Sequence, residues 1–380
     1  MSSIRRLDEA CTLIMGQAPK GDAYNNSGNG WPLIAGAGDF REGRPAPKKH
    51  TTEASKLSGP GDIILGIRAS IGDKVLSDGE YCLGRGVAAL RPNSDVDSRF
   101  LWHWLTYSAP ILAAKGKGAT FKQVNRKDIG EMSFPVLALP EQQRIAQVLD
   151  RADAMCVKRR KTLGLLDDLA HSIFADMFDE GIRSERWKVL PLADAVRTGT
   201  IVTYGIVQAG DEYPGGVPYI RTGDIKNGEI AADQLRRTDP AIAAKFSRSR
   251  VDVGDIVMSI RATVGTTAAV TSEISGANLT QGTARISPGD STDHSYLLYY
   301  LRSRWSQEWI ARQVKGATFR EITLARLREL RISIPPPELQ DEFARRIAEL
   351  DRLRQAQVRH LAGLESLFAS LQYCAFQGGL

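Results

Sequence analysis

Two copies of the tetrapeptide Gly-Ala-Thr-Phe lie in this chain, at residues 118–121 and 316–319, and basic side chains flank both copies. The flanking residues are Lys115, Lys117, Lys122, Arg126 and Lys127 at the first copy and Lys315 and Arg320 at the second. Clustered lysine and arginine can bind the phosphates of nucleic acid and release condensed counterions. A solvated turn has the same composition, so the sequence leaves both interpretations open.

A matched pair of arginines occurs in the segments "GDIILGIRASIG" and "GDIVMSIRATVG". Arg68 and Arg261 each lie near a glycine, Gly72 or Gly265, that would let the backbone approach a ligand closely. Contacts to phosphate carry no sequence information, whereas contacts to base edges do. Because both copies share this arginine, we favour a phosphate contact, or a framework role in binding loop carbonyls, over base reading.

Base reading is expected where the two halves differ, in residues 38–52 and 223–240 and close to them. These segments combine arginine, lysine, asparagine and glutamine, which can bind guanine or adenine edges. The candidate contact residues are Arg41, Arg44, Lys48 and Lys49 in the first half and Tyr204, Arg221, Lys226, Arg236 and Arg237 in the second. The alternative is that each of these side chains is simply solvated.

The motifs of common catalytic sites are missing from the sequence. There is no G-x-x-x-x-G-K-[ST] loop, H-E-x-x-H, G-x-S-x-G or G-x-G-x-x-G, and no Asn/Asp-Pro-Pro-aromatic motif. The five histidines are dispersed, and the four cysteines form no C-x-x-C pair, so neither a metal site nor a disulfide framework is indicated. We therefore expect a non-enzymatic recognition protein that binds no metal or cofactor of its own.

The bulk composition agrees with a globular protein that has an acidic partner. The net charge is +6 and the isoelectric point about 9.1, which favours nucleic acid only weakly. No stretch approaches 18 consecutive apolar residues, and the N-terminus has charges where a signal peptide needs an apolar core. We expect a cytoplasmic protein without a membrane partner.

The landmarks of the first half recur in the same order in the second. Alternating patterns predict short strands at residues 62–67, 87–90, 256–260 and 283–286. The apolar stretches at residues 100–112 and 296–310 predict one helix each, packed on the sheets. Each half is therefore expected to contain a mixed, mainly β domain.

A long helix is expected after each domain. Pro140 and Pro337 each precede a glutamate, which suits a helix start. Apolar residues then alternate in steps of four and three, ending at Ala170, Ile173 and Met177 in the first helix. This seam is interrupted by Arg159 in the first helix and by Arg354 and Gln357 in the second. These residues could fix the register or mark where a partner helix joins.

The predicted fold class is α+β, with two domains joined by two long helices that form an intramolecular antiparallel coiled coil with pseudo-twofold symmetry. The predicted segments are residues 1–136 and 181–335 for the domains and 137–180 and 336–380 for the helices. The alternative is two independent amphipathic helices, each lying on its own domain.

This succession of parts resembles the specificity (S) subunits of type I restriction-modification systems. The resemblance covers essentially the whole chain and is carried by the paired GDI-x4-R segments and by Gly-Ala-Thr-Phe followed by Pro-Glu-x-Gln before each long helix. It implies that each domain reads one half of a bipartite site in double-stranded DNA. The two Gly-Ala-Thr-Phe copies and the two helical seams are separated by the same 198 residues. From this constant offset we expect Phe121 and Phe319 to lie at the joints between domain and helix as buried anchors.

The resemblance further implies partners. Two methyltransferase (M) subunits would dock on the helices and carry S-adenosylmethionine, and restriction (R) subunits would translocate and cleave, with ATP and Mg expected on partner subunits. A Type IIB-like or methylation-only complex is a neighbouring alternative. A scaffold whose two domains bind proteins belongs to a different functional class and stays open.

Overall fold

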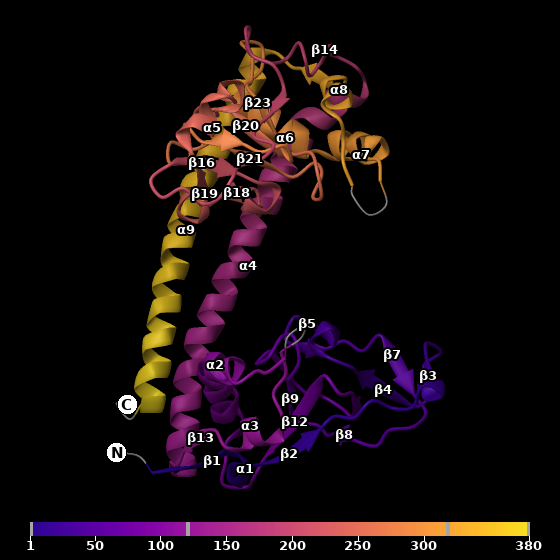
Figure 1. The fold of residues 1–380 in the computed structure, drawn as a ribbon, viewed down its shortest axis with the longest axis vertical. Coiled ribbons are helices and arrows are strands. Elements are labelled where there is room, and N and C mark those ends of the chain that lie inside the picture. The colour runs from indigo at the N-terminus through magenta and orange to yellow at the C-terminus, as the bar shows by residue number, and fades with distance from the viewer. Residues whose placement is uncertain (1–2, 119–121, 317–319, 378–380) are drawn as a thin grey trace. The chain divides into compact units, whose positions relative to one another are not determined.

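The computed structural model describes residues 3–118, 122–316 and 320–377, and it divides into two compact units. The first unit contains residues 1–161 and 359–380, and the second contains residues 162–358. Both long helices, α4 (Leu139–Arg183) and α9 (Pro337–Gln377), contribute residues to both units. Figure 1 shows each unit as small sheets with helices packed against them.

A four-stranded sheet forms the centre of each unit, with the same strand order. In the first unit the order is β10-β9-β12-β2, from strands Lys74–Leu76, Ile63–Gly66, Val87–Pro92 and Cys11–Met15. In the second unit it is β21-β20-β23-β15, from Thr267–Ala269, Ile256–Ser259, Thr283–Ile286 and Thr203–Tyr204. All neighbouring pairs are antiparallel. The four strands predicted from alternation are thereby confirmed.

A further sheet in each unit carries the segments that differ between the halves. In the first unit it has the order β3-β7-β4-β11-β8, from Tyr24–Asn25, Lys49–Thr51, Trp31–Ile34, Tyr81–Leu83 and Leu57–Ser58. In the second unit it has the order β19-β16-β22, from Arg236–Thr238, Val217–Ile220 and Asn278–Leu279. The pairs β4/β11 and β16/β22 are parallel, which preserves the repeat in this sheet too.

Small two-stranded elements complete each unit. β1 (Ile4–Arg6) pairs with β13 (Ser133–Pro135), and β14 (Lys188–Pro191) pairs with β24 (Arg331–Ile334). The hairpins β5–β6 (Phe40–Arg41 and Arg44–Pro45) and β17–β18 (Ile225–Lys226 and Glu229–Ile230) are also repeat-related. The short helices are α1 (Leu7–Ala10), α3 (Arg126–Gly130), α5 (Pro240–Ala244) and α8 (Leu324–Arg328).

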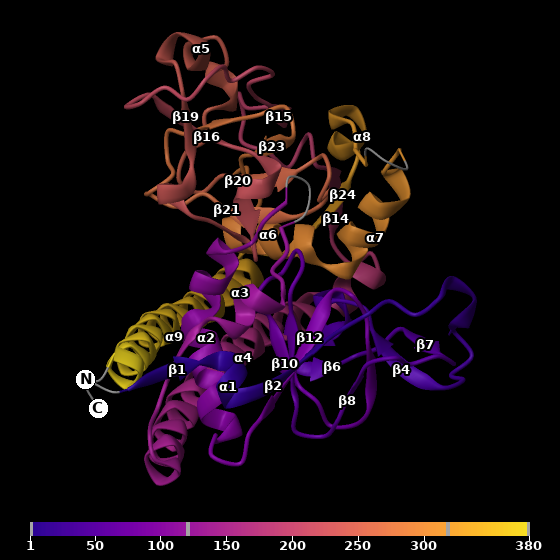
Figure 2. The same cartoon turned by 60° about the horizontal axis from the view of Figure 1, so that its bottom comes forward.

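The sheet-packing helix is continuous in the first unit and broken in the second. α2 (Ser98–Ala114) confirms one predicted helix, but residues 296–310 form α6 (His294–Arg302) and α7 (Arg304–Gln313) instead of a single helix (Figure 2). Ser303 separates them because its backbone is extended, with φ −62° and ψ 156°, and its side chain caps α7. The prediction of one helix was wrong because the apolar pattern continues across this serine.

The two long helices pack antiparallel within each unit. In the first unit Ile145 and Leu149 of α4 share a core with Leu371 and Ala375 of α9. In the second unit Phe174 and Phe178 of α4 share a core with Phe343 and Ile347 of α9. Early residues of one helix thus meet late residues of the other, which confirms the antiparallel pair and excludes two independent helices.

The buried face of α4 differs from the predicted seam at its C-terminal end. Phe174 and Phe178 are fully buried there, whereas the predicted seam residues Ile173 and Met177 are only partly buried. The two phenylalanines contact Tyr296 of α6 as well as Phe343 of α9. The helix is therefore covered on two sides at this end, which widens its apolar face. No helix of the described residues is long and apolar enough to cross a membrane.

Candidate nucleic-acid interface

In the first unit the structure brings together the Arg68 turn and the basic residues around residues 118–121. The backbone N–H of Ala69 donates to the carbonyl of Lys122 (3.1 Å), and that of Val124 donates to the carbonyl of Ile67 (3.0 Å). Lys117 and Gln123 exchange two backbone hydrogen bonds of 3.0 and 2.9 Å. The exposed side chains of Lys117, Lys122 and Arg126 therefore extend from one set of paired loops that includes Arg68.

The second unit repeats this arrangement bond for bond. The N–H of Ala262 donates to the carbonyl of Arg320 (2.9 Å), and Lys315 and Glu321 exchange hydrogen bonds of 2.9 and 3.0 Å. Arg261, Lys315 and Arg320 are all exposed. We call the two sets the basic loop clusters: Arg68, Lys117, Lys122 and Arg126 in the first unit, and Arg261, Lys315 and Arg320 in the second.

The turns that hold Arg68 and Arg261 are strained in the same way. Ala69 and Ala262, which follow the two arginines, have φ values of 58° and 57°. This left-handed conformation is unfavourable for alanine and tends to persist at functional sites. The two arginines differ in their partners, because Arg261 forms an ion pair with Glu321 (3.2 Å) where the first unit has the neutral Gln123.

The candidate base-reading residues form two groups, those that already bind a partner within their own unit and those that do not. Arg221 makes two hydrogen bonds to Asp224 (3.0 and 2.7 Å), and this carboxylate raises the pKa of the guanidinium. Arg237 donates to the carbonyl of Gly216 (2.8 Å), Arg236 lies 3.8 Å from Glu212, and Lys48 donates to the carbonyl of Gly38 (3.3 Å). These four side chains have framework partners within their own units.

The other candidates point into solvent. Arg41, Arg44, Lys49, Tyr204 and Lys226 are all exposed, and within the described parts of the chain no ion pair is found for the charged ones. Arg41 and Arg44 flank the turn of the β5–β6 hairpin, and Lys226 flanks the turn of the β17–β18 hairpin. Lys226 also lines a concavity of roughly 750 Å³ together with Asp351 and Arg354 of α9.

The variable segments begin beside the strained turns. In the second unit Gly282 lies against both Thr222 and Arg261, so that a Cβ added there would approach the Thr222 methyl group to 2.8 Å. In the first unit a Cβ added to Gly66 would come within 2.6 Å of the Ser70 carbonyl in the Arg68 turn and within 3.3 Å of the Ala37 methyl group. The basic loop clusters and the starts of the variable segments therefore lie next to each other in each unit.

One buried glutamine joins each domain to its long helix, Gln142 in the first unit and Gln340 in the second. Their role was not predicted from the sequence. Gln142 accepts a hydrogen bond from the N–H of Asp97 (2.9 Å) and donates to the carbonyls of Asp95 and Leu137 (both 2.9 Å). Gln340 accepts from the N–H of Asp293 (2.7 Å) and donates to the carbonyls of Ser291 and Pro335 (3.1 and 2.8 Å).

A signal for these glutamines was present in the sequence, because both lie in the Pro-Glu motifs that open the long helices. Gln340 is the last residue of Pro-Glu-Leu-Gln at 337–340, whereas Gln142 is the third residue of Pro-Glu-Gln-Gln at 140–143. Asp97 and Asp293, whose N–H groups they bind, cap helices α2 and α6. The other predicted anchors of these joints, Phe121 and Phe319, lie outside the described residues.

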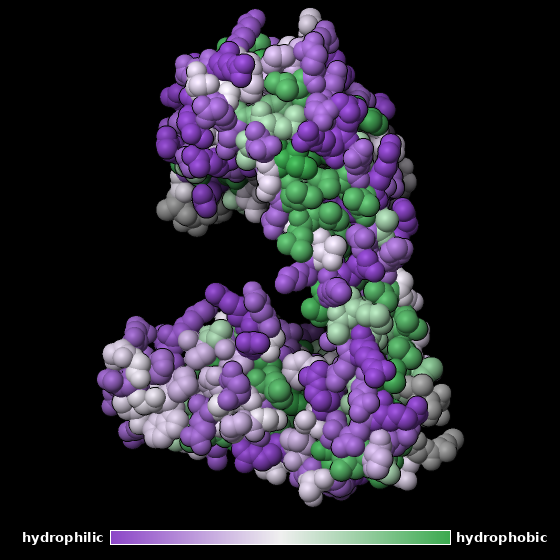
Figure 3. Space-filling model, turned by 180° about the vertical axis from the view of Figure 1, so that it is seen from behind, coloured by the Kyte–Doolittle hydropathy of each residue, from purple (hydrophilic) through white to green (hydrophobic). Residues whose placement is uncertain are grey.

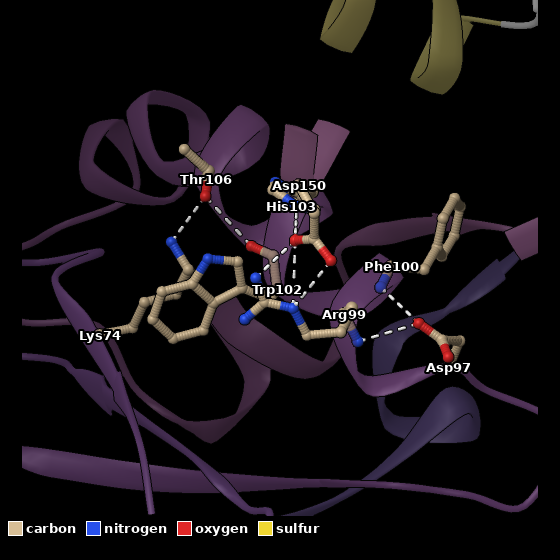
Figure 4. Close-up of polar contacts among 8 residues, drawn as sticks. All are labelled: Lys74, Asp97, Arg99, Phe100, Trp102, His103, Thr106 and Asp150. Carbon is tan, nitrogen blue, oxygen red and sulfur yellow. Dashed lines mark hydrogen bonds and ion pairs between the residues drawn. The ribbon is translucent and has the colours of Figure 1, made fainter. Parts of the chain in front are cut away.

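A polar cluster lies where α2 meets α4 in the first unit (Figure 4). Asp150 of α4 accepts hydrogen bonds from Arg99 (3.1 Å) and is bound to His103 (2.8 Å). Burial alone would raise the pKa of Asp150, but Arg99 and His103 outweigh it and hold the pKa below its usual range. These contacts fix the histidine as a structural residue.

A half-buried lysine completes this cluster. The Lys74 ammonium lies 4.5 Å from the centre of the Trp102 ring and donates to the Thr106 hydroxyl (2.7 Å). Burial lowers the pKa of Lys74 to about 8, against the opposing effect of Asp153 and Asp73. In the second unit Arg302 of α6 supplies the cation between helix and strand. Its guanidinium carbon lies 5.4 Å from the centre of the Tyr299 ring, and its Nε donates to the Thr267 hydroxyl (3.1 Å).

Exposed apolar residues recur on the long helices at equivalent positions of the two copies. Met155 and Leu169 of α4 correspond to Leu353 and Leu367 of α9, each 198 positions later, and all four are 45–54% exposed. Hydrophobic residues are visible among hydrophilic ones along the helices in the space-filling view (Figure 3). Each unit carries one such residue from each helix: Met155 and Leu367 in the first, Leu169 and Leu353 in the second. We call these the apolar pairs.

Comparison with known proteins gives one consistent family. The family model described as "Type I restriction modification DNA specificity domain" matches residues 2–163 and 185–362. The EcoBI type I restriction enzyme specificity subunit of Escherichia coli is 24% identical over 404 residues, covering 98% of this chain and 85% of that protein. A Methanocaldococcus jannaschii protein named as the MjaX specificity subunit is 34% identical over 150 residues, which cover 39% of this chain and only 35% of that protein.

Solved structures share the fold. A chain from a structure of the complex assembly and conformational transition of the type I R-M system is 19% identical, with a TM-score of 0.56, covering 100% of this chain and 98% of that one. The type I S subunit from M. genitalium is 16% identical, with a TM-score of 0.52, covering 99% of this chain and 96% of that one.

Proposed function

Because this chain belongs to the type I restriction-modification DNA specificity family, we propose that it is the non-catalytic subunit that recognises a bipartite DNA sequence for a restriction-modification complex. Each domain reads one half of the site. The paired helices set the distance between the halves and bind the catalytic subunits.

The observation that carries this proposal is the repetition of the basic loop cluster. Two units with different variable segments keep the same loop pairing, the same strained turn and two matched exposed cations, Lys117 and Lys122 in the first unit and Lys315 and Arg320 in the second. A repeated phosphate contact next to a variable surface is what two readers of different sequences need, because phosphate contacts position a protein while base contacts specify the site.

Among the candidates for base reading, the solvent-facing Arg41, Arg44, Lys49, Tyr204 and Lys226 are the stronger ones for DNA contact. Arg221, Arg236 and Arg237 first have to give up or share the partners described above. Arg68 and Arg261 fit a phosphate contact, since both copies retain them.

The apolar pairs are the proposed docking sites for two methyltransferase subunits. One pair lies in each unit and the two are related by the internal repeat, as two copies of one partner require. S-adenosylmethionine, ATP and Mg belong to the partner subunits in this proposal. Among the described residues no group of three or more His, Cys, Asp or Glu side chains is arranged to hold a metal ion.

The proposal is tested with the chain purified together with its methyltransferase partner. Methylation-sensitive sequencing of the host genome, with and without this protein, gives the motif, and a duplex carrying it is compared with a scrambled duplex at physiological salt. We expect the motif duplex to bind at least about a thousandfold more tightly. Equal affinity for both duplexes would refute the proposal.

Single charges of the basic loop clusters provide a control within the same assay. Lys122→Gln should weaken binding to both duplexes alike and reduce the slope of log affinity against log salt by about 1. Arg41→Gln should instead weaken the motif duplex selectively if this arginine reads a base.

The same preparation separates the neighbouring alternatives. Cleavage of unmethylated DNA after addition of restriction subunits identifies a type I system, and methylation alone identifies a methylation-only complex. Methyl transfer by this chain without partners would overturn the non-catalytic assignment.

A further inference from the structure

The two repeat-related hairpins have the same turn but different surroundings. The β5–β6 turn contains Glu42 and Gly43 with φ values of 51° and 75°, and the β17–β18 turn contains Asn227 and Gly228 with 50° and 76°. Two successive residues with positive φ form the type I′ turn that suits a tight hairpin. The backbone therefore leaves no difference between the hairpins, and any difference in function comes from their contacts.

Two arginines hold the turn of the second hairpin against the helices of its unit. Arg302 of α6 donates to the carbonyl of Gly228 (3.2 Å) while it also binds Thr267. Arg354 of α9 forms ion pairs with Glu229 of the hairpin and with Asp167 of α4 (3.1 Å to Asp167). Arg354 thus connects the hairpin with both long helices. Its side chain is only 23% exposed, so its geometry is restricted.

The first hairpin shows no such connection within the part of the chain that the structure describes. Gly43 has open space around it, whereas a Cβ added to Gly228 would come within 2.7 Å of the Arg302 guanidinium. The position of Glu229 is taken by Arg44, and the seam position of Arg354 is taken by Cys156. The half-buried cation of the first unit, Lys74, binds Thr106 and Trp102 instead of a hairpin carbonyl (Figure 4).

We propose that Arg354 is a positioning residue: through Glu229 it fixes the variable hairpin of the second recognition domain to the long helices and thereby sets how this domain is presented to its half of the DNA site. This inference rests on the proposed function. It also gives a physical role to one of the charged residues that interrupt the apolar seam. No such connection is found among the described residues of the first domain, so the two domains differ in how firmly their hairpins are held.

The test uses the complete chain with its methyltransferase partner and duplexes that carry the experimentally determined motif with its natural spacer or with one base pair added or removed. We expect Arg354→Gln to reduce the preference for the natural spacer by roughly fivefold or more. A loss of stability alone would lower the binding of all three duplexes by the same factor and leave their ratio unchanged. Arg354→Lys keeps the charge and should restore part of the preference.

Matched variants localise the effect. Glu229→Gln should reproduce the effect of Arg354→Gln on the spacer preference, and the double variant should be no worse than Arg354→Gln alone, because both changes remove the ion pair that ties the hairpin to α9. Arg346→Gln removes an ion pair that stays within α9, between Arg346 and Glu342 (2.8 Å), and should leave the spacer preference intact. Gly228→Ala should impair the spacer preference more than Gly43→Ala, because an added Cβ would meet the Arg302 guanidinium at Gly228 but open space at Gly43. Both changes impose the same backbone strain.

The outcomes are distinguishable. If the wild-type complex prefers the natural spacer and Arg354→Gln retains this preference, the positioning role is refuted and the proposed function stands. If the wild-type complex shows no preference for any bipartite motif, the proposed function fails and this inference fails with it.

Discussion

At the scale of single residues, the half-buried cation between strand and helix in each unit, Lys74 or Arg302, is the least expected feature. Lys74 comes from a strand and binds a threonine of the neighbouring helix, whereas Arg302 comes from the helix and binds a threonine of the strand. The charge has thus exchanged places between two packed elements. Each cation lies over an aromatic ring of the helix, but the rings, Trp102 and Tyr299, come from positions that do not correspond in the repeat. This exchange indicates that both units need a cation at this point, irrespective of which element supplies it.

The pH dependence of stability provides a test of the Lys74 site. Its folded pKa of about 8 lies below the unfolded value of about 10.4. Below pH 8 both states bind the proton, but between about 8 and 10.4 only the unfolded state does, so stability rises with pH. We expect the free energy of unfolding of the wild type to rise relative to Lys74→Met by up to roughly 3 kcal/mol across this window.

The measurement is urea unfolding at a series of pH values, with Lys127→Met as a control for the loss of one exposed charge. A difference between wild type and Lys74→Met that stays constant from pH 7.5 to 10 would show that Lys74 is not buried as described.

At the scale of elements, the joint between domain and helix depends on one glutamine in each unit. Gln142→Leu and Gln340→Leu each remove three hydrogen bonds and leave a buried N–H and two carbonyls without partners. We expect a cost of about 2–4 kcal/mol for each. Hydrogen exchange at the amides of Asp97 and Asp293 should accelerate accordingly, each in its own variant. The control is Gln143→Leu at the exposed neighbouring position. If this variant lost as much stability as Gln142→Leu, the proposed role of Gln142 would be contradicted.

The elements also show what could be predicted from the sequence. Strands β9, β12, β20 and β23 follow from alternation, and the starts of α4 and α9 follow from proline and glutamate. The break at Ser303 was missed because the residues on both sides of it have the pattern of one helix. The partners of Arg354 could not be predicted, because Glu229 and Asp167 are 125 and 187 residues away in the chain. Periodicity reports which face of an element is buried, but not which distant charge a residue will meet.

At the scale of the whole molecule, the internal repeat predicts how many partners bind. If each apolar pair binds one methyltransferase subunit, Met155→Glu/Leu367→Glu should remove the site of the first unit and Leu169→Glu/Leu353→Glu that of the second. We expect either double variant to bind one partner subunit, and the quadruple variant to bind none, since each charge would have to be desolvated in the interface. Native mass spectrometry of the complex measures this stoichiometry directly.

The repeat also supplies the control for this experiment. Val157 and Val358 are exposed apolar residues on the same helices, but their counterparts in the other copy are Gln355 and Arg160. Val157→Gln/Val358→Arg gives each position the residue that the other copy already carries, so two partner subunits should still bind. If this variant loses a partner while the apolar-pair variants keep both, the partners dock elsewhere on the helices. In that case the matched exposure of Met155, Leu353, Leu169 and Leu367 would reflect the duplication alone, and not a pair of binding sites.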